Sequence, residues 1–212
     1  MTEILIEGFN KTIIMVFFST LFSIIIGFIP AIALIVTAPK GLKPNKGVYK
    51  TLDTIINILR GFPFLILMVA IMPLTKLIVG KSIGTTAAIV PLTIAAAPFV
   101  ARIIESALKE VDPGVVEAAK SFGASNTQII FRVMLKEAVP SIISGLTLTI
   151  ISIIGYSAMA GTVGAGGLGD LAVRYGYQRY QTDVMIVTVI ILVVIVQVLQ
   201  SLGNYLYKKL SQ

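Results

Sequence analysis

The sequence contains no cysteine and no histidine among its 212 residues. It therefore forms no disulfide, and it lacks the side chains that hold most zinc, haem and iron–sulfur sites. Charge is also scarce, because 13% of the residues are Asp, Glu, Lys or Arg, whereas a soluble domain has about a quarter. These absences exclude an ordinary soluble domain and predict no metal site.

The few charged residues leave long uncharged stretches. Four of these lie between Lys11 and Lys40, Lys81 and Arg102, Glu137 and Asp170, and Asp183 and Lys208. Each holds the roughly 20 apolar residues that span a bilayer core. A fifth stretch, before Lys76, reaches this length if its helix begins near Thr54 and carries Arg60 close to one interface. We therefore predict an all-α polytopic membrane protein, a single domain over 1–212, with five transmembrane helices near 12–37, 54–76, 83–104, 138–160 and 184–206.

The basic residues are distributed unevenly across these spans. With five spans, the first loop, the third loop and the C-terminus share one side and hold most of them: Lys40, Lys43, Lys46, Lys50, Arg102, Lys109, Lys120, Arg132, Lys136, Lys208 and Lys209. The positive-inside rule then predicts a multi-pass bacterial cell-membrane protein with its N-terminus outside and its C-terminus in the cytoplasm. This topology accounts for the net charge of +7 better than a nucleic-acid partner does. We expect no signal peptide, because the first ten residues contain no basic residue.

A polar segment, residues 112–137, separates the third and fourth predicted spans. It begins with Asp112 and Pro113, which are favoured at the N-cap and the first position of a helix. This helix should run to about Phe122 and end at Gly123, a residue suited to the position after a C-cap. A short connection does not require so much structure, so we predict a contact surface for another protein.

A second helix is predicted to follow the first. Ser125 and Gln128 have the spacing of a capping box, which would open a helix that continues into the fourth span. On the first helix, an apolar face is formed by Val115, Val116, Ala119 and Phe122. A short helix with a small apolar face suits a groove on a partner protein. The alternative is a helix on the membrane surface, which would favour bulky apolar anchors and clustered basic residues.

Two glycine motifs suggest nucleotide binding, but neither has the context that it needs. Residues 164–169 match the spacing G-x-G-x-x-G, yet they follow a predicted membrane helix instead of a strand. Residues 80–82 resemble the end of a phosphate-binding loop, whose first glycine would fall at Thr75. We therefore expect no cofactor on this chain.

The polar segment resembles the EAA motif of ABC-importer permeases. The matching residues are Glu117-Ala118-Ala119, then Gly123 after three residues, Val133 after nine more, and Leu135. Lys136 stands where the motif usually has a proline. The resemblance implies that a coupling helix containing Glu117, Ala118, Ala119, Phe122 and Gly123 docks into a cytoplasmic ABC ATPase and transmits its motion. ATP and Mg would then bind to that partner.

Other segments resemble one branch of these permeases. Residues 60–64 look like the start of the second helix in amino-acid permeases, and residues 89–93, 97–99, 155–159 and 164–169 are similar to the methionine-uptake permeases. This implies an importer of type I permease fold for L-methionine, with D-methionine also considered. The implied partners are a second copy of this chain, ATPase subunits, an extracytoplasmic substrate-binding lipoprotein and membrane lipid.

Five residues are predicted to lie along the translocation pathway. Prolines in two successive spans (Pro63, Pro73, Pro91 and Pro98) favour a lined pathway over an irregular bundle. We assign Tyr156, Ser157 and Met159 to the pathway, with Arg60 and Pro63 near its inner mouth. The resemblance implies that Met159 narrows the inner gate, although methionine is also an ordinary packing residue. The alternative for Arg60 is an interfacial position paired with Asp53 or Glu105.

Three other functions are less favoured. A permease for another amino acid would have the same architecture. A secondary transporter without an ATPase usually has carboxylates deep in the membrane, whereas the acidic residues here are expected at helix ends or in loops. A membrane enzyme lacks support, because we find no catalytic residues.

Overall fold

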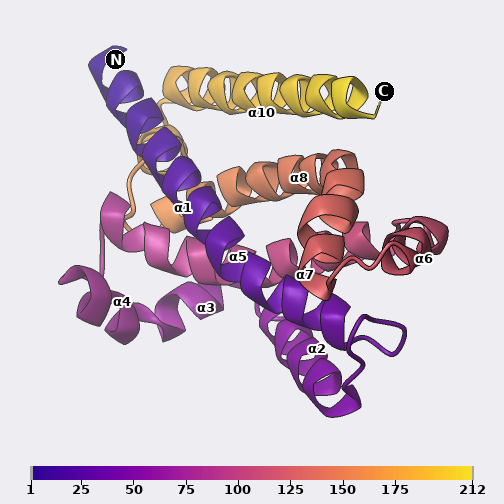
Figure 1. Ribbon diagram of the computed structural model, residues 1–212. Coiled ribbons are helices and arrows are strands. Elements are labelled where there is room, and N and C mark those ends of the chain that lie inside the picture. Colours follow the sequence, from indigo (N-terminus) through magenta and orange to yellow (C-terminus); the bar gives the residue numbers. More distant parts are fainter. Residues whose placement is uncertain (1, 212) are drawn as a thin grey trace.

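The computed structural model describes residues 2–211, which fold into helices with no strand among them (Figure 1). The four long helices are α1 (Thr2–Thr37), α5 (Thr85–Lys109), α8 (Leu135–Gly161) and α10 (Thr182–Leu210). The shorter ones are α2 (Lys46–Arg60), α3 (Phe64–Ala70), α4 (Met72–Val79), α6 (Pro113–Ser121), α7 (Asn126–Gln128) and α9 (Leu168–Leu171). Two segments are π-helical, η1 (Ile129–Met134) and η2 (Ala172–Tyr177).

Within residues 2–211, four helical stretches are long and apolar enough to cross a membrane: Thr2–Thr37, Thr85–Lys109, Asn126–Gly161 and Thr182–Leu210. The bent pair α2–α3 makes a fifth candidate span. The structure thus has the four to five apolar helices expected of the predicted fold class.

Helix α5 is the centre of the bundle. In the most apolar stretch of α5, 67% of the residues are buried, whereas in that of α10 only 11% are. Helix α10 therefore lies on the outside of the bundle. Small residues let α1 and α5 approach each other closely. A Cβ added at Gly27 of α1 would lie 2.6 Å from the carbonyl oxygen of Ala97 in α5. Such close contacts of small residues are a common way to pack helices in membranes.

Two apolar clusters follow one another along α5. The first surrounds Leu92 and includes Met15 and Ile153, and the second surrounds Ile104 and includes Leu34. Next to the second cluster lie the end of α1, helix α2 and helix α6, and we call this the α2/α6 end of the bundle. Figure 1 shows that α6 and the C-terminus lie toward the same side of the molecule.

The prediction of one helix over 54–76 is wrong. Helix α2 begins eight residues earlier, where the Asn45 side chain accepts a hydrogen bond from the Val48 amide at 3.1 Å. It ends at Arg60, and the axis of α3 turns from it by 101°. The cause is Pro63, because a proline disfavours helical backbone at the residue before it and cannot donate to the preceding turn. The same rule places Pro73 in the first turn of α4.

The other four predicted spans overlap the long helices, which are longer than predicted at most ends. Charged residues such as Glu3, Glu7 and Lys109 lie inside α1 and α5. The charges therefore mark where the apolar run ends, while the backbone hydrogen bonds of the helix continue past that point. Pro91 and Pro98 both lie inside α5 without breaking it.

Candidate functional site

Helix α6 has the two ends that the sequence predicts. Asp112 is its N-cap, and the Asp112 carboxylate accepts a hydrogen bond from the Gly114 amide at 2.7 Å. The helix ends at Ser121, with Phe122 as the C-cap. Gly123 then adopts the left-handed conformation (φ 78°), which turns the chain away from the helix axis. Glycine adopts this backbone without the steric penalty of a Cβ.

The capping box that begins the next helix is also confirmed. The Gln128 amide donates to Ser125 Oγ at 3.3 Å, and the Ser125 amide donates to Gln128 Oε1 at 2.8 Å. Helix α7 continues through η1 into α8 without a break, so the corner at Gly123 connects α6 to the start of a membrane span.

The predicted apolar face of α6 is divided between two sides of the helix. Val116 and Ala119 pack against the cluster around Ile104. Val115, Ala118 and Phe122 are exposed, and Phe122 is 91% exposed. The prediction of a single apolar face was wrong, because residues 115 and 116 point about 100° apart on a helix. The stripe of Val116 and Ala119 therefore faces the bundle, and the stripe of Val115, Ala118 and Phe122 faces away from it. Of the EAA residues, Glu117 and Ala118 are exposed and Ala119 is half-buried.

The three predicted pathway residues on α8 occupy different surroundings. The Tyr156 ring stacks on that of Phe64, with 4.9 Å between centroids, and so joins α8 to α3. Ser157 is buried, and its hydroxyl donates to the Ile154 carbonyl of the same helix at 2.7 Å. Met159 is 46% exposed, two residues before the end of α8.

The other two predicted pathway residues lie where α2 meets α3. Pro63 is exposed at the N-cap of α3. The Arg60 guanidinium is exposed and lies 5.0 Å from the centroid of the Phe99 ring. Phe99 and Tyr156 line a small hollow of about 120 Å³. Of the five predicted pathway residues, Tyr156 lines this hollow, and Arg60 contacts Phe99, one of its other lining residues. Pro63, Ser157 and Met159 do not line it.

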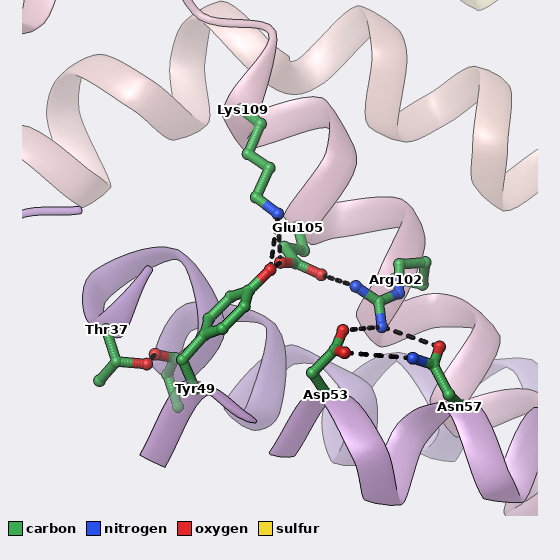
Figure 2. A network of polar contacts seen from close by, with 8 residues as sticks. Thr37, Tyr49, Asp53, Asn57, Arg102, Glu105 and Lys109 are labelled. Carbon is green, nitrogen blue, oxygen red and sulfur yellow. Dashed lines mark hydrogen bonds and ion pairs between the residues drawn. The ribbon is translucent and has the colours of Figure 1, made fainter. Parts of the chain in front are cut away.

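The polar partner of Asp53 and Glu105 is Arg102, not Arg60. Arg102 Nη1 lies 2.6 Å from Glu105 Oε2, and Arg102 Nη2 lies 2.6 Å from Asp53 Oδ1. Lys109 Nζ lies 2.6 Å from the other oxygen of Glu105. Figure 2 shows these contacts between α2 and α5, together with Tyr49, whose hydroxyl donates to Glu105 at 3.3 Å.

This network is the main feature that the sequence analysis missed. The Glu105 side chain is 1% exposed, and a buried carboxylate is tolerated when cations and hydrogen bonds surround it. A signal for it was present in the sequence. Tyr49, Asp53 and Asn57 recur every four residues on one face of α2, and residues 102, 105 and 109 share a face of α5. The charged members of both stripes were assigned to loops or helix ends, so the contact between the two faces was not predicted.

The fold and the site define a polytopic membrane protein that presents a capped helix outside its spanning helices. The chain belongs to the family of binding-protein-dependent transport system inner membrane components, which matches residues 23–212. It is thus the membrane component of a transporter, and the expectation that it is not an enzyme is confirmed.

Individual relatives place the chain more narrowly. A probable D-methionine transport system permease, MetI of Vibrio cholerae, is 50% identical over 209 residues, 99% of this chain and 93% of that protein. The methionine import system permease MetP of Bacillus subtilis is 43% identical over 173 residues, 82% of this chain and 78% of that protein.

A solved structure extends this likeness to three dimensions. A chain of the MetNI methionine ABC transporter in an inward-facing conformation has 42% identity and a TM-score of 0.98, covering 100% of this chain and 98% of that one. The resemblance to methionine-uptake ABC permeases is therefore confirmed.

Proposed function

We propose that this protein is the membrane-spanning permease subunit of an ATP-binding-cassette importer for methionine. The observation that carries the proposal is the match to a chain of the MetNI transporter, with a TM-score of 0.98 over the whole of this chain. The match extends through α6 and the outer segments as well as the spanning helices, so it concerns the transport machinery and not a general membrane bundle.

Helix α6 is the coupling helix of this proposal, and it docks on a cytoplasmic ATPase that holds ATP and Mg. The outward stripe of Val115, Ala118 and Phe122 supports this, because a highly exposed phenylalanine on an apolar stripe is typical of an anchor that enters a partner's pocket. Glu117 flanks the same stripe and adds a charge at its edge. Docking through this stripe leaves Val116 and Ala119 on the bundle.

The proposed orientation places the α2/α6 end in the cytoplasm and the N-terminus outside. The loop after α1 and the start of α2 supply four lysines at this end, and more basic residues follow at the end of α5, along α6 and at the end of α10. Such an excess of Lys and Arg in short loops favours retention on the cytoplasmic side.

The pathway lies between two copies of this chain, which receive methionine from an extracytoplasmic binding protein. In each copy, the proposed pathway surface includes Arg60 at the end of α2, Pro63 at the N-cap of α3, and Tyr156 and Met159 on α8. Closure of the ATPase pair on ATP moves α6 and opens the pathway outward, and release of the products reopens it inward. Each state is stabilised by its differential contacts with the nucleotide-bound ATPase.

A reconstituted transport assay tests the proposal. The permease–ATPase complex is placed in liposomes with the binding protein, and uptake of labelled L-methionine is measured with and without ATP. Uptake should require ATP, and unlabelled L-methionine or D-methionine should compete with it while other amino acids compete weakly. Uptake that does not need ATP would identify a secondary transporter, and stronger competition by another amino acid would change the substrate.

A further inference from the structure

A groove of about 500 Å³ lies between the coupling helix and the bundle. Its walls are apolar and come from separate elements: Ile35 at the end of α1, Leu108 at the end of α5, Val116 on α6 and Met134 in η1. The volume lies within the range of sites that hold small molecules. None of the outward residues Val115, Ala118 and Phe122 lines it, so the groove is distinct from the proposed ATPase-docking stripe.

The rim of the groove carries an excess of positive charge. Three lysines line it, Lys40, Lys109 and Lys120, against one carboxylate, that of Glu117. The Lys109 ammonium is already neutralised by Glu105. Within residues 2–211, neither Lys40 nor Lys120 takes part in an ion pair. Two unpaired ammonium groups therefore flank an apolar cavity.

We propose that this groove binds an anionic phospholipid of the inner leaflet, with its phosphate between Lys40 and Lys120 and its apolar part against the walls. The inference rests on the proposed function, because it uses the orientation that places α6 in the cytoplasm. The ends of two candidate spans form the walls, so the groove lies at the depth where headgroups meet acyl chains. Basic pockets between spanning helices on the cytoplasmic side are typical sites for anionic headgroups.

A lipid in this position would bridge two parts that no ion pair joins. Lys40 belongs to the loop after α1, whereas Lys120 belongs to α6. A phosphate shared by both lysines holds the coupling helix against the bundle without fixing it rigidly. The lipid composition of the membrane would then tune how strongly movements of the ATPase reach the spanning helices.

Lipid retention by the purified permease–ATPase complex tests the proposal. The complex is exchanged into nanodiscs of phosphatidylcholine with or without phosphatidylglycerol. The complex is then extracted from the nanodiscs, and the phosphatidylglycerol that stays bound to it is quantified by native mass spectrometry. The double variant Lys40→Gln/Lys120→Gln should bind phosphatidylglycerol about 30-fold more weakly, as expected for two lysines near an anionic surface. The matched control is Lys46→Gln/Lys50→Gln, which removes the same charge from exposed lysines of α2 that do not line the groove. The control should retain the lipid, as should Lys40→Arg/Lys120→Arg.

Three outcomes would overturn the proposal. Equal loss in both glutamine double variants would indicate diffuse surface charge in place of a site. Unchanged lipid retention, with weaker ATPase association in every lipid, would indicate that a segment of the ATPase fills the groove. Unchanged retention and association would mean that the groove binds neither. Because lipid retention is measured without methionine, a failure here leaves the transport assay and its conclusion unaffected.

Discussion

Helices α2 and α6 lie at the same end of α5, yet they are attached to the bundle in different ways. Three side chains of α2 contact three charged side chains of α5, and the centre of this network is the buried Glu105 (Figure 2). Within residues 2–211, α6 forms no ion pair, none of its residues is fully buried, and the hydrogen bonds of its side chains stay within residues 112–121.

The difference separates a fixed helix from a movable one. A buried carboxylate holds its partners in a defined geometry, because leaving any of them unpaired is unfavourable. A small apolar contact such as that of Val116 and Ala119 tolerates sliding. Elements that move in a working cycle are drawn from the weakly held parts of a protein. We therefore expect α2 to move together with α5, and α6 to shift against both.

Removing the centre of the network should have the largest effect. Glu105→Gln leaves the Arg102 and Lys109 cations without their shared carboxylate, and breaking a buried pair of this kind costs about 3–5 kcal/mol. The measurement is thermal or denaturant unfolding of the detergent-solubilised permease–ATPase complex. Glu137→Gln, an exposed carboxylate outside any ion pair within residues 2–211, serves as the control. Equal stability of the two variants would mean that the network does not fasten α2. If Glu105→Gln does not fold, Asp53→Asn tests the same connection from α2.

Truncating the exposed anchor of α6 should affect binding but not folding. Phe122→Ala removes the ring that is proposed to enter the ATPase, and the loss of an anchor of this kind weakens binding by about 2 kcal/mol or more. Titration of purified ATPase onto the permease in nanodiscs measures the change, and the melting temperature of the permease alone should stay the same. Phe17→Ala, which removes an exposed phenylalanine from α1, is the control. Unchanged ATPase affinity would contradict the assignment of the outward stripe.

The corner after α6 gives a third way to test the comparison. Gly123→Ala places a Cβ in a left-handed backbone, which costs about 1–2 kcal/mol. No atom lies within 4 Å of that Cβ, so the effect should come from the backbone alone. Methionine-stimulated ATP hydrolysis should fall relative to basal hydrolysis, and Gly123→Asn should be milder because Asn tolerates this conformation. Equal activity of both variants and the parent protein would mean that the corner need not be rigid.

The smallest expected effect concerns the edge of the network. Tyr49→Phe removes the hydroxyl that donates to Glu105 at 3.3 Å and accepts from Lys109 at 3.1 Å, and hydrogen bonds of this kind contribute about 1 kcal/mol each. Unfolding measurements should show a small loss of stability while the affinity for the ATPase stays the same. A loss of ATPase affinity instead would show that α2 and α6 are coupled, against the separation proposed above.

The parts of this structure that could be predicted from the sequence are those decided by neighbours in the chain. The caps at Asp112 and Ser125 and the turn at Gly123 depend on residues within one helical turn, and the structure contains all three. The bend at Pro63 was missed because the apolar run continues on both sides of it. The length of that run favoured one continuous span over a helix break at the proline. The partner of Glu105 was missed because it depends on which faces of α2 and α5 meet. That contact is set by packing of the whole bundle.

The π-helical turn of η1 sets the direction in which α6 points. At its end the Leu135 amide donates to the carbonyl of Ile130, five residues back, where an α-helix would use the fourth. One more residue is therefore accommodated in this turn than an α-helix holds. Deleting a single residue from 129–134 would restore an ordinary turn and rotate everything before it by about 100° around the axis of α8. The stripe of α6 that faces outward would then turn toward the side, so one residue in this π-helical turn sets the angle of a contact surface several residues away.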